Sequence, residues 1–297
     1  MKKASLLLFA SISLLSCNND KNKFDASGTF EAIETIISSD ANGTINAFNI
    51  EEGQLLESNQ VIGTIDSTQL YLKKVQLEKQ INALLSKKPN VNIQLAALNT
   101  QLSKANKEKN RISNLLRDGA ATSKQLDDIN ADIEVLKKQI DAQKSSLSIT
   151  SDGISNDANP LYIQVKQLED QLQKCKIINK TKGTVLTKYA EVNEMTSQGK
   201  PLYKIADLTS IILRAYITGN QLPNIKLNQT VIVNTDDGKG GFKTTQGTIT
   251  WISNKAEFTP KTIQTKDERA NLVYAIKVKV KNDGSYKIGM YGEIKFQ

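Results

Sequence analysis

The sequence predicts an elongated α+β protein: a long antiparallel α-helical coiled-coil hairpin is inserted into a split β sandwich, and a small β-barrel follows. Three observations predict this fold. Apolar residues recur with heptad spacing over residues 67–176, a β-rich repeat flanks that segment on both sides, and short strand patterns fill residues 208–297. Aromatic residues make up only 5% of the chain, which is low for one large globular core but normal for a coiled coil.

Residues 1–16 predict a signal peptide, and residues 17–27 predict a lipid-anchored linker. Lys2 and Lys3 precede a short apolar run, and Ser16 stands directly before Cys17. This pattern resembles a bacterial lipoprotein signal, although Leu15 departs from the small residue that usually stands there. The apolar run is shorter than the ~20 residues that span a bilayer, so we expect cleavage and lipid attachment at Cys17 rather than a transmembrane helix.

Composition argues against catalysis and against nucleic-acid binding. The chain has no histidine, which excludes histidine-based triads and the common zinc sites. The net charge of +8 comes from lysines that alternate with Asp, Glu and Gln along the predicted helices, as on a solvated surface. If Cys17 carries lipid, Cys175 is the only remaining thiol and a disulfide framework is impossible. We therefore expect no enzyme activity, no cofactor, no metal site and no nucleic-acid partner.

The β-rich repeat predicts the split sandwich. The segment Gly43–Asp66 returns, without a gap, as Gly183–Ala206. Neither half is large enough to bury its apolar face alone, so residues 38–66 and 177–207 are expected to pack together. We expect residues 28–37 to form one strand that completes the barrel. The barrel's other strands are expected at 211–219, 230–235, 247–253, 272–280 and 292–296.

The hairpin is predicted by a seam of residues at alternating steps of four and three. The outgoing arm carries Leu77, Ile81, Leu84, Lys88, Val91, Leu95, Leu98, Leu102, Ala105, Lys109, Ile112 and Leu116. The return arm carries Leu126, Ile129, Ile133, Leu136, Ile140, Gln143 and Leu147, then Leu161, Val165, Leu168, Leu172 and Cys175. Two arms of near-equal length are expected to pair.

The turn and the breaks of the hairpin are also encoded locally. Gly119 is suited to end the first helix in a left-handed conformation, and Thr122 with Gln125 forms a capping-box pattern that starts the second. Pro89 and Gly153 lie at the same height on the two arms. They predict a shared kink or interruption, which on the return arm would fall within the polar run 148–160.

This order of parts resembles the HlyD family of periplasmic adaptors, also called membrane fusion proteins. Two half-motifs of the biotinyl/lipoyl type are split by a coiled-coil hairpin and followed by a barrel, and residues 257–278 and 287–294 resemble the barrel of these adaptors. At the apex, Arg111, Leu115 and Thr122 have the spacing Arg-x3-Leu-x6-Ser/Thr, which is similar to the tip motif that contacts TolC-like outer-membrane channels.

The resemblance implies a non-enzymatic adaptor of a tripartite efflux or secretion system. Such a protein bridges an inner-membrane transporter, with the ABC type favoured here, to a TolC-like channel in the outer membrane. It implies a hexamer in the envelope of a Gram-negative bacterium, periplasmic and held at the inner membrane by lipid on Cys17.

Two other hypotheses remain open. The chain could be a structural coiled-coil envelope lipoprotein that acts as a spacer or scaffold, since the cap alone explains Thr122. A lipoyl or biotin carrier would need a lysine on a turn between adjacent strands, whereas the lysines near the junctions do not occupy such a turn: Lys73, Lys74, Lys176, Lys180 and Lys182. Glu268 and Arg269 are interpreted as part of a solvated loop.

Overall fold

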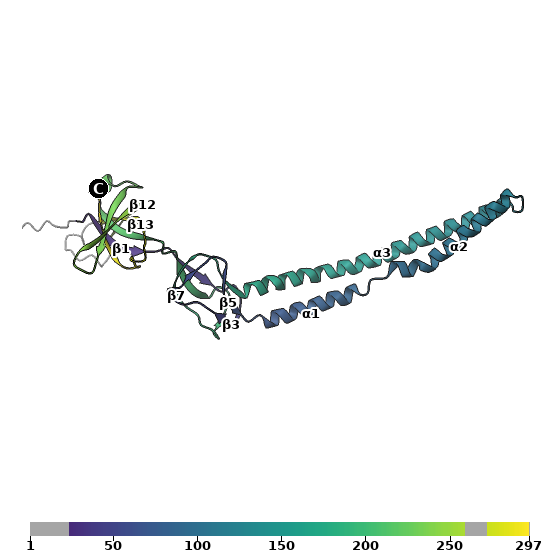
Figure 1. The fold of residues 1–297 in the computed structure, drawn as a ribbon, viewed down its shortest axis with the longest axis horizontal. Coiled ribbons are helices and arrows are strands. Elements are labelled where there is room, and N and C mark those ends of the chain that lie inside the picture. Colours follow the sequence, from purple (N-terminus) through teal and green to yellow (C-terminus); the bar gives the residue numbers. More distant parts are fainter. Residues whose placement is uncertain (1–23, 259–271, 297) are drawn as a thin grey trace, which may run out of the picture.

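The computed structural model describes residues 24–258 and 272–296, so Cys17, Glu268 and Arg269 lie outside the described residues. The protein is elongated, with a β-barrel at one end, two small sheets next to it and paired helices that extend to the other end (Figure 1). The predicted α+β class with a barrel and helices is confirmed.

The barrel is closed, with the strand order β1-β10-β13-β12-β11-β14. Alternation between buried and partly exposed residues along β10 places Ile211, Leu213, Ala215 and Ile217 in its core, where Phe30 of β1 joins them. The strand bounds are β1 Ala26–Glu31, β10 Ser210–Thr218, β11 Thr230–Asp236, β12 Phe242–Phe258, β13 Leu272–Lys281 and β14 Tyr291–Lys295, with a short 3-10 helix, η1, at Leu222–Asn224.

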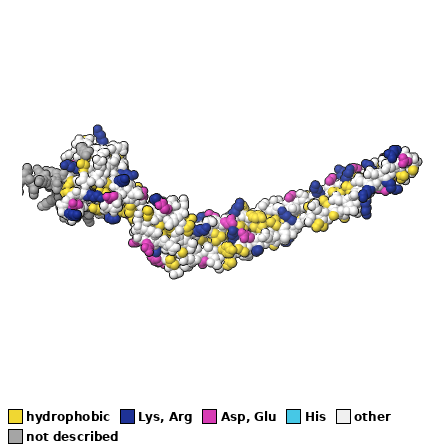
Figure 2. Space-filling model, in the orientation of Figure 1, with side chains coloured by type: hydrophobic (Ala, Val, Ile, Leu, Met, Phe, Trp, Pro, Cys, Tyr) yellow, Lys and Arg dark blue, Asp and Glu magenta, His cyan; other side chains and the backbone are white. Residues whose placement is uncertain are grey.

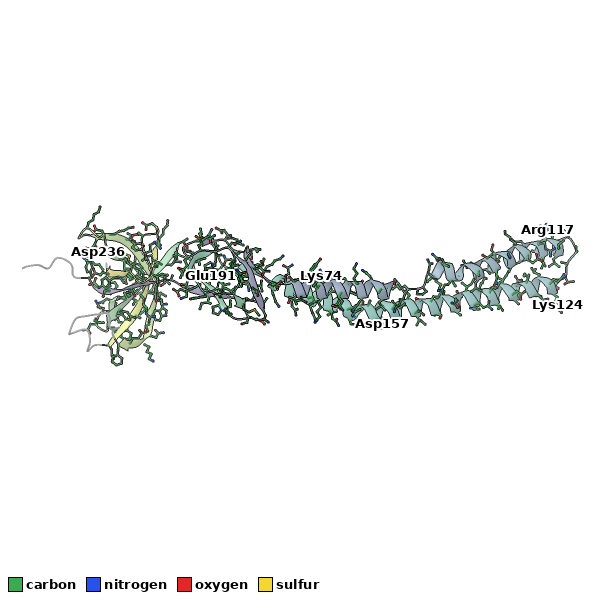
Figure 3. The ribbon with its side chains drawn as sticks, turned by 90° about the horizontal axis from the view of Figure 1, so that it is seen from below. Lys74, Arg117, Lys124, Asp157, Glu191 and Asp236 are labelled. Atoms are coloured by element: carbon green, nitrogen blue, oxygen red, sulfur yellow. The ribbon has the colours of Figure 1, made fainter. Side chains whose placement is uncertain are left out.

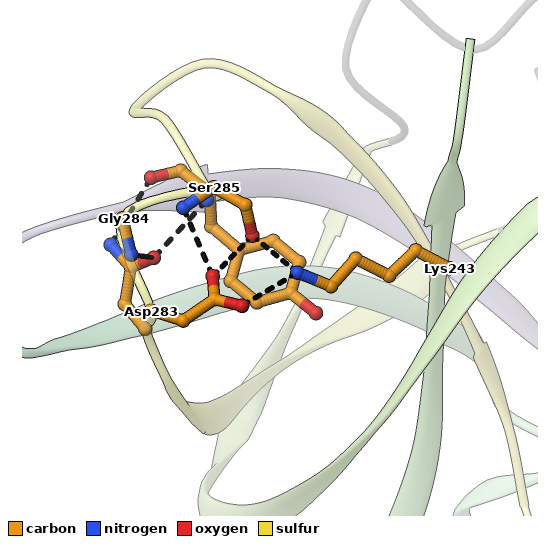
Figure 4. A network of polar contacts seen from close by, with 6 residues as sticks. Lys243, Asp283, Gly284 and Ser285 are labelled. Carbon is orange, nitrogen blue, oxygen red and sulfur yellow. Dashed lines mark hydrogen bonds and ion pairs between the residues drawn. The ribbon is translucent and has the colours of Figure 1, made fainter.

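A polar network ties the turn after β13 to the neighbouring strand β12 (Figure 4). The Nζ atom of Lys243 lies 2.7 Å from Oδ2 of Asp283 and 2.7 Å from Oγ of Ser285. The hydrogen bond from Lys243, together with those that the Ser285 hydroxyl and N–H donate to Asp283, holds the pKa of the Asp283 carboxyl well below its usual range. Gly284 follows with φ of 95°, a left-handed conformation that glycine adopts readily.

The repeat forms two four-stranded sheets that share one core. One sheet has the order β2-β9-β7-β4 and the other has the order β6-β5-β3-β8. Side chains of both sheets, including Ile45, Leu56, Val185, Leu202 and Ile205, are buried together between them. The strands are β2 Glu34–Ser38, β3 Gly43–Phe48, β4 Leu55–Leu56, β5 Gln60–Ile65, β6 Lys176–Asn179, β7 Gly183–Lys188, β8 Met195–Thr196 and β9 Pro201–Ala206.

Each half of the repeat completes the sheet of the other half. The short strand β4 pairs with β7, and its counterpart β8 pairs with β3. The backbone N–H of Gly53 donates to the carbonyl of Val185 at 2.8 Å, and in the matching bond Asn193 donates to Ile45, also at 2.8 Å. Because of this exchange, the two halves cannot satisfy their backbone groups separately.

The turns of the two halves also correspond residue by residue. Gly53 and Asn193 occupy equivalent turns with φ of 85° and 71°, and Asn59 and Gly199 occupy the next pair with φ of 63° and 86°. Glycine and asparagine are the residues that tolerate left-handed backbone best. The repeat therefore conserves backbone conformation even where its two halves differ in sequence.

The prediction of one strand over residues 28–37 is wrong. β1 ends at Glu31 in the barrel, while β2 pairs with β9 in the adjacent sheet. Phe30 is buried in the barrel core and Ile37 packs against the core between the two sheets. These two residues are an odd number of positions apart, so one straight strand would point them to opposite faces. Ile33, exposed between β1 and β2, lies where the chain passes from one core to the other.

Three helices make the extended part of the molecule: α1 Thr68–Leu85, α2 Val91–Arg117 and α3 Ser123–Lys174. α1 and α2 lie in sequence alongside the single long helix α3 (Figure 1). Seam residues on both arms are buried or half-buried, and Leu77, Ile81, Val165 and Leu168 form a core near the base of the hairpin. Lys88 and Gln143 are the exposed exceptions among the predicted seam positions.

The predicted interruption of both arms is correct for the outgoing arm only. The outgoing arm is broken between Leu85 and Val91, because the residue before a proline disfavours helix and Asn90 caps α2 by accepting from the N–H of Ile93 at 3.3 Å.

The return arm, in contrast, is a continuous helix through Gly153 and Pro160. The seam persists there through Ser151, Ile154 and Ala158, and Ala158 is fully buried. A glycine costs a helix only about 1 kcal/mol relative to alanine, which such packing offsets. Pro160 is exposed, so the carbonyl that loses its helical partner can face water.

Candidate functional site at the hairpin apex

The apex is closed by a tight helix C-terminal motif that ends α2. Gly119 has φ of 70° and its N–H donates to the carbonyl of Leu116 at 3.1 Å, while the N–H of Ala120 donates to the carbonyl of Leu115 at 2.7 Å. This pair of bonds is the Schellman arrangement, which satisfies carbonyls that a helix end would otherwise leave unpaired. The predicted role of Gly119 is confirmed, and the sequence analysis missed the part that the Leu115 carbonyl takes in the turn.

The start of α3 is fixed by the predicted capping box. The N–H of Gln125 donates to Oγ1 of Thr122 at 3.3 Å, and the N–H of Thr122 donates to Oε1 of Gln125 at 2.9 Å. Two backbone donors at the helix start are thereby satisfied reciprocally. The Thr122 hydroxyl is exposed but already engaged within the turn.

Arg111 lies on α2 three residues after Glu108, an acidic neighbour that the sequence did not single out. Its guanidinium donates two hydrogen bonds to Glu108, at 2.9 Å from Nε and 2.6 Å from Nη2. These bonds lower the pKa of Glu108 and raise that of Arg111. The Arg111 side chain remains 65% exposed, and an exposed pair within one helix stabilises little, so the guanidinium is accessible to a partner.

Leu115 differs from Arg111 and Thr122 because its side chain is apolar and only partly buried. The seam uses Ile112 and Leu116, so Leu115 lies beside the core of the hairpin. Arg111 is one turn away on the same side, as residues four apart are on a helix. The structure therefore brings Arg111 and Leu115 together on α2, with Thr122 across the turn at the start of α3.

The apex is far from the β domains. Figure 3 labels Arg117 and Lys124 beside the turn, Lys74 and Asp157 along the arms, and Glu191 and Asp236 in the two β units. α3 alone, with 52 residues, is about 78 Å long at 1.5 Å per residue. The exposed groups of the apex are thus presented at the tip of a long arm.

The rest of the described chain offers little for cofactor or metal chemistry. Across residues 24–258 and 272–296, no group of three or more Cys, Asp or Glu side chains is placed to hold a metal ion. Lys180 and Lys182 lie between β6 and β7, which belong to different sheets, and they pair with Asp40 and Glu57. Among the described helices, none combines the length and the apolar character needed to cross a membrane.

Comparison with known sequences gives a partial match. No family model matches the chain. The UPF0194 membrane protein YbhG of Salmonella gallinarum is 32% identical over 126 residues, which are 42% of this chain and 38% of that protein. The Salmonella arizonae protein of the same name is 31% identical over the same length. The matched region therefore spans well under half of these curated relatives.

Comparison with solved structures covers nearly the whole chain. MacA from Actinobacillus actinomycetemcomitans matches with a TM-score of 0.54 and 18% identity, over 92% of this chain and 78% of that one. The periplasmic adaptor protein EmrA matches with a TM-score of 0.50 and 15% identity, over 93% of this chain and 98% of that one. The chain has the fold of a membrane fusion protein. The predicted resemblance to periplasmic adaptors is thus confirmed.

The membrane fusion protein Spr0693 from Streptococcus pneumoniae R6 extends the same comparison. It matches with a TM-score of 0.50 and 14% identity over 91% of this chain and 98% of that one. At such identities the membrane fusion protein fold is what the neighbours share with this chain. Function must be argued from the chain's own residues.

Proposed function

We propose that this protein is a non-enzymatic periplasmic adaptor of a tripartite efflux or secretion system. It is held at the inner membrane of a Gram-negative bacterium by lipid on Cys17 and contacts an inner-membrane transporter, with the ABC type favoured, through the barrel end. Its two-sheet unit is a lipoyl-like sandwich, and its helices form a coiled-coil hairpin that reaches a TolC-like outer-membrane channel. Copies assemble into a ring, for which the resemblance implies six.

One observation supports this proposal most. Thr122 and the Leu115 carbonyl serve the turn itself, yet the Leu115 side chain stays partly exposed beside the exposed Arg111 guanidinium. An apolar group next to a basic one, carried at the end of an arm about 78 Å long, suits contact with a helical partner. An envelope spacer would need the length of the arm but not these two groups.

Co-purification tests the proposal directly. The full-length lipoprotein is extracted from native membranes after mild crosslinking, and its partners are identified by mass spectrometry. We expect an inner-membrane transporter and an outer-membrane channel in the same preparation. Recovery of envelope polymer alone, with unchanged export in a deletion strain, would favour the spacer instead. Intact mass showing a lysine-linked cofactor would favour a carrier.

A further inference from the structure

The barrel has two rims, and one of them adjoins the two small sheets. β1 leads through residues 32–33 into β2, and β9 leads through residues 207–209 into β10, so the end of β1 and the start of β10 mark the rim next to the sheets. The other rim carries the start of β1, the connection from β10 to β11, the end of β12 and the start of β13. We call them the sheet-side rim and the free rim. The free rim lies at the end of the molecule opposite the hairpin apex (Figure 1).

The free rim presents large apolar side chains to water. Phe258 and Leu272 are directly opposite each other on β12 and β13 and are 83% and 54% exposed. β10 ends at Thr218, opposite Val273, so this pair extends past the last residue of the neighbouring strand. Leu227, between η1 and β11, is 57% exposed on the same rim. Single exposed leucines are common on protein surfaces, but a phenylalanine and two leucines on one rim indicate a contact surface.

Lysines accompany these apolar side chains. Three of them are exposed at the free rim and have no ion-pair partner among residues 24–258 and 272–296, and we call them the free-rim lysines: Lys226, Lys255 and Lys295. The carboxylates of this rim are engaged. Asp25 accepts from the N–H of Phe296 at 2.7 Å, and Glu257 pairs with Arg214 at 3.2 Å. The free rim is therefore basic as well as apolar.

The sheet-side rim has a mixed character. The segments 236–241 and 282–290 form its turns and contain three aspartates: Asp236, Asp237 and Asp283. The same rim carries three exposed lysines, which we call the sheet-side lysines: Lys239, Lys281 and Lys287. Basic and hydrophobic side chains both reach the surface of the barrel in the space-filling view (Figure 2). The two rims thus have the same number of these lysines but differ in acidic and apolar residues.

The proposed anchor would bring a membrane within reach of the free rim. Ala26, where β1 begins, is nine positions after Cys17, and nine residues span at most about 32 Å. The sheets and the helices extend from the other side of the barrel, so the free rim can lie flat against a bilayer while the hairpin points away from it. Anionic headgroups complement the free-rim lysines, and the region beneath the headgroups accepts apolar side chains.

We propose that the free rim rests on the phospholipid bilayer that holds the anchor. Phe258, Leu272 and Leu227 enter the boundary between headgroups and acyl chains, and the free-rim lysines contact anionic headgroups. A lipid on a flexible tether lets the molecule rotate at the membrane, whereas this second contact holds its long axis away from the bilayer and directs the apex across the periplasm. The inference rests on the proposed anchoring at Cys17 and adds a membrane-binding surface to it.

Binding to vesicles tests the rim without its anchor. The mature chain, residues 17–297, carries Cys17→Ser and therefore no lipid, and it is sedimented with vesicles of phosphatidylcholine and phosphatidylglycerol. We expect binding, and we expect Phe258→Ser/Leu272→Ser to lower the partition coefficient at least about tenfold, because the apolar contact is lost. Ile288→Ser, which removes an exposed apolar side chain from the sheet-side rim, is the matched control and should change it by less than about twofold.

The lysines supply a second test with an equal change of charge. Lys226→Gln/Lys255→Gln/Lys295→Gln should lower binding to these vesicles at least about tenfold, since each lysine near an anionic surface contributes about fivefold. The same replacement of the three sheet-side lysines should have little effect. No sedimentation of the chain, equal losses in the two triple variants, or binding only to vesicles that contain an inner-membrane transporter would each overturn the contact.

A tryptophan reporter tests the contact in the intact lipoprotein. The chain contains one tryptophan, so Trp251→Phe removes the native signal. In that background Phe258→Trp is reconstituted into vesicles whose acyl chains carry bromine, and we expect quenching and a blue-shifted emission. Ile288→Trp is the control at the sheet-side rim and should not be quenched. Equal quenching at the two positions would overturn the orientation proposed here.

Intact mass and the reporter together separate this inference from the adaptor proposal. Lipid on Cys17 with no quenching at position 258 would reject the rim contact and keep the anchored adaptor. A mature chain that carries no lipid but still sediments through the free rim would reject the anchor and keep the contact.

Discussion

Leu115 contributes its carbonyl to the apex turn, whereas its side chain is not needed there. Replacing that side chain therefore tests docking with little risk to the fold. We expect Leu115→Asp to abolish export and apex-to-channel crosslinking, because a charge placed in an apolar contact costs several kcal/mol of association. Arg111→Asp should act likewise by reversing the charge, while Thr122→Ser keeps the cap and should be tolerated.

Ser113→Asp is the matched control, since it adds the same charge about 200° around the helix from Leu115. Circular dichroism and protein levels report folding in every variant. Wild-type export by both Leu115→Asp and Arg111→Asp at normal levels would reject docking at the apex.

Tyr203 shows how one buried polar residue makes the sandwich sensitive to alkaline pH. Its hydroxyl donates to Oδ1 of Asn179 at 2.9 Å inside the core, and burial raises its pKa to about 12. A folded pKa above the unfolded value of about 10 gives stability that is complete below pH 10 and is lost as pH rises towards 12. We expect urea unfolding to show this loss, and Tyr203→Phe to be less sensitive between pH 10 and 12.

Comparing the wild-type protein with Tyr203→Phe isolates the contribution of the Tyr203 hydroxyl, because both proteins contain the same lysines. At neutral pH, Tyr203→Phe should cost about 1–3 kcal/mol, since Asn179 loses a buried partner. If the free energy of unfolding fell equally steeply between pH 10 and 12 in the wild-type protein and in Tyr203→Phe, the Tyr203 phenol would not carry the pH dependence.

At the scale of elements, the same substitution should have opposite signs at two glycines of the hairpin. Gly119 has φ of 70°, so Gly119→Ala should destabilise the hairpin by about 1–2 kcal/mol. Gly153 lies inside α3 with open space around an added Cβ, so Gly153→Ala should stabilise it by about 0.5–1 kcal/mol. Thermal unfolding followed at 222 nm measures both. A loss of stability in Gly153→Ala would contradict a continuous α3.

The whole molecule depends on the length of its arms. Deleting 98–104 together with 137–143 removes one heptad from each arm, which keeps the outgoing seam in step and shortens the reach by about 10 Å. We expect a folded protein whose apex no longer crosslinks to the channel and which no longer supports export. Deleting 98–104 alone should leave the arms mismatched and lower the melting temperature.

The control for this prediction keeps the length and changes the residues. Replacing 98–104 with a copy of 91–97, and 137–143 with a copy of 130–136, preserves seam register and reach. Export should survive in this variant. Export by the shortened chain at normal protein levels would show that the length of the arm is not what the function requires.

Local chemistry in the sequence determined the hairpin apex and the β repeat. Apolar residues at steps of three and four allow only one buried face per helix, so the seam determined which residues of each arm face the other arm. Gly119, Thr122 and Gln125 act on backbone groups within one turn, and their effect could be predicted without knowing the rest of the chain. The repeat likewise predicted a shared core, because neither half could bury its apolar residues alone.

Tertiary structure decided what depended on distant partners. Residues 26–38 became two strands because two different sheets bind them, with Phe30 and Ile37 in separate cores. The exchange of β4 and β8 between halves left no local signal. α3 stayed helical through Gly153 and Pro160 because packing of Ile154 and Ala158 against the other arm outweighs the weak local preference, while Pro89, followed by the cap at Asn90, ended the outgoing helix.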